Sequence, residues 1–215
     1  MYFDMASTDT ATAYKLLAAS VVPRPIAWTV TRDVNGGLNA APFSFFNVMG
    51  SDPPVVALGI LGDPERGLKD TARNIIETGE FVVNLVPVGL VHKMNLTAID
   101  APKGVNEIAL AGLATLPSQR VMPPRLAESP VAFECVNQAS IMTGPNQLLV
   151  VGRVLAIHIQ DAFVIDAKRG HVDTLGLDLV ARTFGSGYAR IGEQFNLARP
   201  TWAERSAVPG LKQSS

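Results

Sequence analysis

Hydrophobic and polar positions first alternate between Ile26 and Arg32. One face of this segment carries Ile26, Trp28 and Val30, and the other carries Ala27, Thr29 and Thr31. A period of two predicts a half-buried β-strand. Residues 33–37 follow as a turn, because their Asn-Gly pair tolerates the positive φ values of tight hairpins. Residues 38–48 return as a second strand, and Pro42 within it indicates an edge or a bulge.

Later apolar runs have the length of strands, and only short helical patterns lie between them. Strands are predicted over 55–60, 81–86, 131–142 and 148–159, with a short edge at 163–165; helices are predicted over 10–20, 70–79 and 88–98. Asp9 is a candidate cap for the first helix, and Asp70 or Thr71 for the second, which ends at Gly79. A short helix and irregular segments are expected over 100–130, and a loop with some helix over 176–189.

About six or seven strands with few helices predict a mainly β protein, an antiparallel barrel with short covering helices. Residues 1–202 are expected to form one domain, and 203–215 a polar, flexible C-terminal tail. The 215-residue chain is 47% hydrophobic and 17% charged with a net charge of −1. That balance excludes a disordered chain and a basic nucleic-acid binder, and it slightly favours self-association.

The sequence predicts a cytoplasmic protein without a disulfide. Its start shows no secretory signal, and no apolar run approaches the roughly eighteen residues of a membrane span. Cys135 is the single cysteine, and its strand-like surroundings favour an inert packed thiol over a reactive one. The three histidines are scattered, so no metal site is predicted. His158 lies in an apolar run, where a core or sheet-facing role is favoured over catalysis.

Two polar clusters are candidates for chemistry. Lys69 and Thr71 stand at a predicted helix start, where free N–H groups, a charge and a hydroxyl can bind one anion. The alternative is a solvated Lys69 beside an ordinary cap. Asn39, Ser44 and Asn47 interrupt an apolar strand near Pro42, which frees backbone groups for a planar heterocycle. An edge strand with these side chains facing solvent explains the pattern equally well.

Known nucleotide and hydrolase signatures are missing from the sequence. It has no Gly-x-Ser-x-Gly elbow, no Walker loop and no Gly-x-Gly-x-x-Gly between a strand and a helix. A nicotinamide nucleotide would therefore bind without a Rossmann unit.

An ordered series of blocks resembles the flavin reductase-like family of FMN-binding split-barrel proteins. The blocks cover residues 24–28, 41–47, 52–54, 69–75, 78–84, 129–131, 134–135, 181–188 and 199–200. The resemblance implies a split β-barrel, a homodimer, and FMN near the subunit interface. By similarity, the flavin ring is lined by Trp28, Thr29, Thr31, Ser44, Phe45 and Asn47. Lys69 and Thr71 would meet the phosphate, with Arg182 and Tyr188 close to the cofactor. Phe184 departs from the family pattern, where glycine is commoner.

The implied activity is hydride transfer from NADH or NADPH to flavin, carried by the flavin rather than by catalytic side chains. The reduced flavin would serve a flavin-dependent monooxygenase or another electron acceptor; no nucleic acid and no membrane are implied as partners. The alternatives are a non-enzymatic FMN-binding electron carrier or flavin-storage protein, and a barrel that has lost its cofactor and serves in protein interactions.

Overall fold

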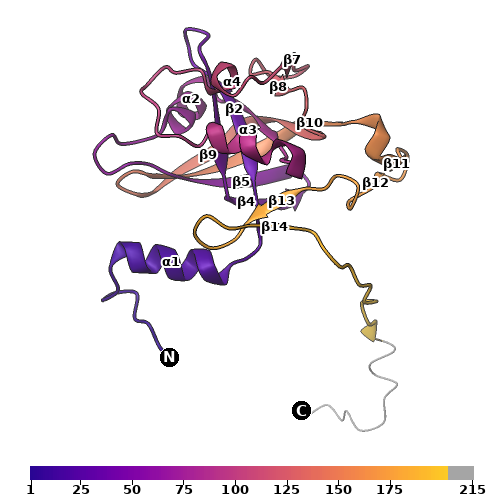
Figure 1. Cartoon of the computed structure of the whole chain (residues 1–215), viewed down its shortest axis with the longest axis horizontal. Helices are drawn as coiled ribbons and strands as arrows, with labels where there is room; N and C mark the ends of the chain where they lie inside the picture. The colour runs from indigo at the N-terminus through magenta and orange to yellow at the C-terminus, as the bar shows by residue number, and fades with distance from the viewer. Residues whose placement is uncertain (203–215) are drawn as a thin grey trace.

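A seven-stranded antiparallel sheet organises the computed structural model, which describes residues 1–202 (Figure 1). In spatial order its strands are β3 (Leu38–Phe43), β2 (Ala27–Arg32), β6 (Glu80–Asn84), β9 (Val131–Gly144), β10 (Gln147–Ile159), β5 (Pro54–Leu61) and β4 (Phe45–Ser51). The edge strands β3 and β4 are consecutive in the chain, so the sheet curls until its two edges meet at Ser44. The mainly β, split-barrel architecture expected from the sequence is confirmed.

The predicted single strand over 38–48 is wrong, because it is two strands separated by Ser44. β3 pairs with β2 at one edge of the sheet, and β4 pairs with β5 at the other. The chain must therefore change partners between Phe43 and Phe45. Pro42 lies opposite Trp28 on the edge strand β3, where its missing N–H removes no ladder hydrogen bond from the interior of the sheet.

Strand β2 is buried on both faces rather than on one. Trp28 and Val30 pack in a core with Met94 of α3 (Val91–Leu96), while Ala27 packs in a second core with Ile75 of α2 (Asp70–Thr78). Thr29 and Thr31 are fully buried as well. The prediction of a half-buried strand failed because one face packs against α3 and the other against α2 and strands β5 and β10 of the curled sheet. The alternation of residues within one strand cannot reveal this.

Helix α1 (Thr10–Ser20) confirms its predicted cap, since Asp9 Oδ1 accepts the Thr12 N–H at 3.0 Å. Helix α2 ends, as expected, at Gly79 with a φ of 74°. Its N-cap is Lys69, without a capping side-chain hydrogen bond, so neither Asp70 nor Thr71 caps it as predicted. The helix predicted over 88–98 is the 3-10 turn η1 (Val88–Leu90) followed by α3, and α4 (Glu107–Leu110) lies within the irregular region.

Three small sheets complete the fold. β1 (Arg24–Pro25), β13 (Val180–Arg182) and β14 (Tyr188–Arg190) form one; β7 (Thr115–Leu116) pairs with β8 (Arg125–Leu126), and β11 (Val164–Asp166), after η2 (Asp161–Phe163), pairs with β12 (His171–Val172). The predicted loop with some helix over 176–189 therefore contains strands. Among the described residues β11 pairs with β12 alone, so the predicted short edge over 163–165 does not extend the large sheet.

Helix α1 lies at the side of the barrel near β13 and β14, touching it through Tyr14 and Phe45, and residues 191–202 extend away from the barrel (Figure 1). Large apolar side chains on both are solvent-exposed, including Leu17, Phe195 and Leu197. The predicted tail, residues 203–215, lies outside the described residues. Within residues 1–202, no helix is both long and apolar enough to span a membrane.

Candidate functional site

A groove of about 960 Å³ opens at the N-terminus of α2. Its walls come from Asn39, Ala41 and Pro42 on β3, from the segment 61–73 that leads into α2, from residues 97–103, and from Glu107 of α4. Its volume is near the upper end of the roughly 300 to 1,000 Å³ of sites that hold one drug-sized ligand. The groove therefore has room for a nucleotide-sized molecule.

Lys69 supplies the free positive charge at the start of α2. Its side chain is solvent-exposed, and its Nζ lies 5.9 Å from the centroid of the Phe43 ring. Within residues 1–202 the Lys69 ammonium group has no hydrogen bond or ion pair. The first turn of a helix also presents N–H groups without intrahelical acceptors and the positive end of the helix dipole. Charge and N–H donors thus converge at one end of the groove.

The Thr71 hydroxyl is held in a fixed orientation by its neighbours. Thr71 is 1% exposed, and its Oγ1 accepts a hydrogen bond from Asn39 Nδ2 at 2.8 Å. Asn74 Nδ2 donates to Thr31 Oγ1 at 3.0 Å and ties α2 to β2 in the same network. Because Asn39 occupies an acceptor position of the Thr71 oxygen, the hydroxyl hydrogen remains available to donate to a ligand.

Most other charges of the groove already have partners. Arg66 pairs with Asp100 at 2.7 Å across the mouth, and Arg73 pairs with Asp70. Lys103 resembles Lys69 in having no hydrogen bond or ion pair within the described part of the chain. The groove therefore offers two unpaired ammonium groups against carboxylates that are largely engaged, a balance suited to an anion.

Glu107 is a buried carboxyl group among the residues that line the groove. It is 7% exposed, and its Oε2 accepts the Ala40 N–H at 3.1 Å, which fixes α4 on the edge strand β3. Burial raises the pKa of the Glu107 carboxyl, the Ala40 N–H opposes that shift, and the nearby Asp70 charge adds to it. A bound anion near Glu107 would add to the upward shift of this pKa, in the same direction as the Asp70 charge.

None of the six residues expected at a ligand ring lines the groove, and three of the six are fully buried. Trp28 is fully buried, and its Nε1 donates to Thr97 Oγ1 at 2.9 Å. Thr29 Oγ1 donates to the Ala27 carbonyl at 3.3 Å, and Thr31 Oγ1 accepts from Nδ2 of Asn39 and of Asn74. All three lie behind the groove wall, where they position β3 and α2.

Ser44, Phe45 and Asn47 lie where the two sheet edges meet. Ser44 Oγ is 3.4 Å from Arg24 Nε, and the Phe45 ring lies 5.9 Å from the Arg24 guanidinium and 6.1 Å from the Tyr14 ring. Asn47 is exposed, with its side-chain oxygen accepting the Val48 N–H. Pro42, which lines the groove, closely precedes Ser44 in the chain, so the groove wall leads directly to this junction.

The late glycine-tyrosine segment approaches the same junction. Arg182 packs 4.6 Å from the Tyr188 ring, and Arg24 Nη2 donates to the Thr183 carbonyl at 3.0 Å. Arg24 is only 6% exposed and also donates to the carbonyls of Ala18 and Val21. It therefore joins α1, the 183–188 loop and Ser44. Sequence reasoning did not assign this role to Arg24, because its partners lie up to 159 positions away.

The surroundings of Cys135 agree with the inert, packed thiol that the sequence predicts. Its side chain is fully buried, and burial followed by the nearby Glu134 charge raises the pKa of the thiol to about 12. The reactive thiolate is therefore scarce at neutral pH.

A model of the flavin reductase-like domain matches residues 19–176. The chain belongs to the flavin reductase-like family. Among its relatives, an uncharacterized protein of Deinococcus radiodurans is 43% identical over 209 residues, which cover 94% of this chain and 91% of that protein. The uncharacterized protein YwrF of Bacillus subtilis is 39% identical over 193 residues, covering 87% and 93% of the two chains.

Solved structures of similar proteins support the same fold for this flavin reductase-like chain. Nitrilotriacetate monooxygenase component B of Bacillus cereus superposes with a TM-score of 0.86 at 33% identity, covering 92% of this chain and 98% of that one. The 2-nitrobenzoate 2-nitroreductase NbaA of Pseudomonas fluorescens gives 0.85 at 30% identity, covering 94% and 98%. A flavin reductase-like protein with a split-barrel domain from Shewanella frigidimarina gives 0.79 at 20% identity, covering 93% and 100%.

Proposed function

We propose that the chain binds FMN in the groove at the start of α2 and uses NADH or NADPH to reduce it. The observation that carries this proposal is the donor set of Lys69, Thr71 and the first turn of α2, which fits a phosphate. Membership of the flavin reductase-like family supports the same cofactor. A bound flavin would supply the hydride-accepting ring, which no side chain of the protein can replace.

In this proposal the chain's own residues bind and orient rather than react. Lys69 neutralises phosphate charge, and Asn39 turns the Thr71 hydroxyl towards it. The ring would extend from the groove to the junction of the two sheet edges, in contact with Pro42, Ser44 and Phe45. Arg182 and Tyr188 would lie beside it. Trp28, Thr29 and Thr31 are buried within β2 and would stabilise the strand behind the groove. Their expected contacts with the ring stay a prediction.

The likeness to a monooxygenase component supports an acceptor outside the chain. Component B of nitrilotriacetate monooxygenase is named as one part of a larger system, and this chain spans nearly all of its length. We therefore propose that reduced flavin leaves this protein's groove for a flavin-dependent monooxygenase or another acceptor.

Activity is tested by adding FMN and either NADH or NADPH and following nicotinamide absorbance. We expect oxidation of at least one nucleotide, dependent on both FMN and protein. Riboflavin, which lacks the phosphate, serves as the matched ligand and is expected to bind more weakly than FMN. Tight FMN binding without oxidation of either nucleotide would point to an electron carrier, and absence of FMN binding would remove the proposal altogether.

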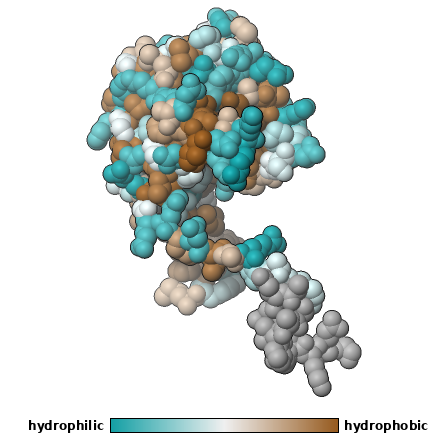
Figure 2. All heavy atoms as spheres, turned by 90° about the vertical axis from the view of Figure 1, so that its right-hand side faces the viewer, coloured by the Kyte–Doolittle hydropathy of each residue, from teal (hydrophilic) through white to brown (hydrophobic). Residues whose placement is uncertain are grey.

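A homodimer is part of the same proposal. Val48 and Met49 on β4 are each more than 60% exposed, and Leu17 of α1 is 59% exposed. Figure 2 shows hydrophobic residues among hydrophilic ones on the barrel face that it views. Apolar side chains on a helix at the side of the barrel and on an edge strand favour burial against a second copy.

Light scattering measures the association state directly. We expect a mass near twice the 22.9 kDa of the chain, and Met49→Lys should shift the protein towards the monomer. A wild-type mass near 22.9 kDa at micromolar concentration would contradict the dimer.

A further inference from the structure

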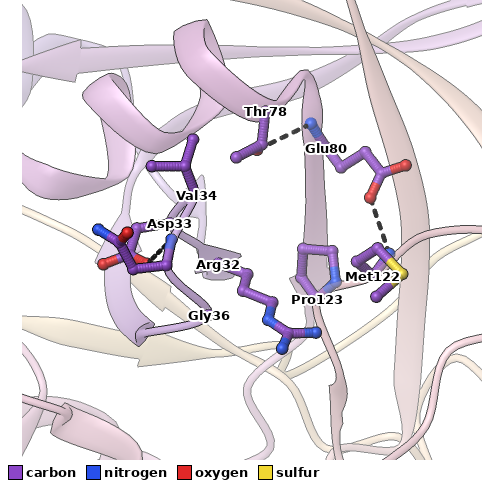
Figure 3. Close-up of a pocket in the computed structure, with 9 residues that line it drawn as sticks. Arg32, Asp33, Val34, Gly36, Thr78, Glu80, Met122 and Pro123 are labelled. Atoms are coloured by element: carbon purple, nitrogen blue, oxygen red, sulfur yellow. Dashed lines mark hydrogen bonds between the residues drawn. The ribbon is translucent and has the colours of Figure 1, made fainter.

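A second cavity, of about 460 Å³, lies at the opposite end of α2 and shares no lining residue with the groove. Figure 3 shows it between the 33–36 turn, the start of β6 and the wall formed by Met122 and Pro123. Its volume is within the range of small-ligand sites.

Arg32 is the charged group of this cavity that lacks a partner. Its side chain points across the cavity in Figure 3, and within residues 1–202 its guanidinium makes no hydrogen bond or ion pair. Gly36, with a φ of 92°, leaves the space that the guanidinium occupies, because a Cβ there would lie 3.0 Å from Arg32 Nη2. The turn therefore accommodates Arg32 in this position.

The two carboxylates of the cavity are engaged with backbone groups instead. Asp33 Oδ1 accepts the N–H groups of Asn35 and Gly37, each at 2.8 Å. Glu80 Oε2 accepts the Met122 N–H at 2.8 Å and so holds the opposite wall in place (Figure 3). Both acids shape the cavity while leaving the guanidinium fork free.

From this arrangement we propose that the second cavity binds a small organic monocarboxylate. A guanidinium fork matches a planar carboxylate with two parallel hydrogen bonds. Val34, Met122 and Pro123 give an apolar wall for the body of the ligand. Asp33 and Glu80 repel anions in general, and they repel a ligand with a second carboxylate or a phosphate more strongly than a monocarboxylate.

Phenylacetate and its neutral counterpart phenylacetamide are the probes, used with the full-length chain in titration calorimetry. We expect phenylacetate to bind with a Kd of about 0.1 to 1 mM, the range for so small a ligand, and phenylacetamide about tenfold more weakly or worse. Arg32→Ala should weaken phenylacetate roughly 10- to 100-fold, with Arg32→Lys intermediate because it keeps the charge without the fork.

Two controls separate this cavity from the rest of the surface. Arg169→Ala removes an exposed arginine in the 167–170 turn, and Lys69→Ala alters the groove; neither should change the Kd of phenylacetate by more than about twofold. Equal binding of acid and amide, an unchanged Kd in Arg32→Ala, weakening by Lys69→Ala, or no saturation below about 10 mM would each overturn the proposal.

Discussion

Glu134→Ala is expected to lower the free energy of unfolding by about 3 to 5 kcal/mol, the cost of removing one partner from a buried charged network. Glu134 has no exposed side-chain area. Its Oε1 and Oε2 accept the Gln119 N–H at 2.9 and 3.1 Å, and Oε2 accepts the Arg120 N–H at 2.6 Å. His158 Nε2 also contacts Oε1, and it must carry the hydrogen because an ionised carboxylate can only accept.

The network fixes the sign of a pH effect. Burial raises the pKa of the Glu134 carboxyl, but the bonds from Gln119, His158 and Arg120 outweigh it, so the net pKa is below its ordinary value of 4.5. The stabilisation is therefore complete above pH 4.5 and is lost as the pH falls through the folded-state pKa. The difference between wild type and variant should shrink in acid.

Urea unfolding followed by circular dichroism measures this effect at pH 7 and below pH 4.5. Glu128→Ala is the matched control, because its carboxylate forms an exposed pair with Lys93 and should cost no more than about 1 kcal/mol. If Glu134→Ala does not fold, Glu134→Gln, which keeps one acceptor oxygen, should show a smaller loss. A loss below about 1 kcal/mol in Glu134→Ala would contradict the role of the network.

Local rules predicted the parts of the fold that depend on neighbouring residues. The 33–37 turn, the cap at Asp9 and the end of α2 at Gly79 follow from side chains within a few positions. The same locality made Lys69 and Thr71 recognisable from their sequence pattern as a candidate anion site. Lys69 and Thr71 lie close together in the groove because α2 begins at the position that its sequence pattern predicts.

Long-range pairing explains what the sequence did not reveal. The break at Ser44 exists because β3 and β4 pair with strands at opposite edges, and β13 is a strand because it pairs with β1, more than 150 positions away. Glu107 and Glu134 bond to N–H groups 67 and 14 to 15 positions distant. No spacing in the sequence indicates such contacts, so the sequence did not identify Glu107 and Glu134 as buried, hydrogen-bonded carboxylates.

Lys69→Ala is expected to weaken FMN binding by about 1.5 to 3 kcal/mol, or roughly 10- to 150-fold in Kd, because it removes a charge-assisted contact to phosphate. Lys69 is exposed and unpaired within the described chain, so its loss leaves no buried partner stranded and should not alter folding. The effect should also fade at high salt, since exposed charges are screened.

Flavin fluorescence titrations with FMN and riboflavin distinguish a phosphate contact from a general disturbance of the groove. Riboflavin lacks the phosphate, so its Kd should be nearly the same in wild type and Lys69→Ala, whereas the Kd of FMN should rise. Lys69→Arg should retain most of the affinity because it keeps the charge, and Lys168→Ala, in the 167–170 turn away from the groove, should retain all of it. An FMN affinity within twofold of wild type would make Lys69 a solvated surface residue, and an equal loss for both ligands would move its contact from the phosphate to the ring.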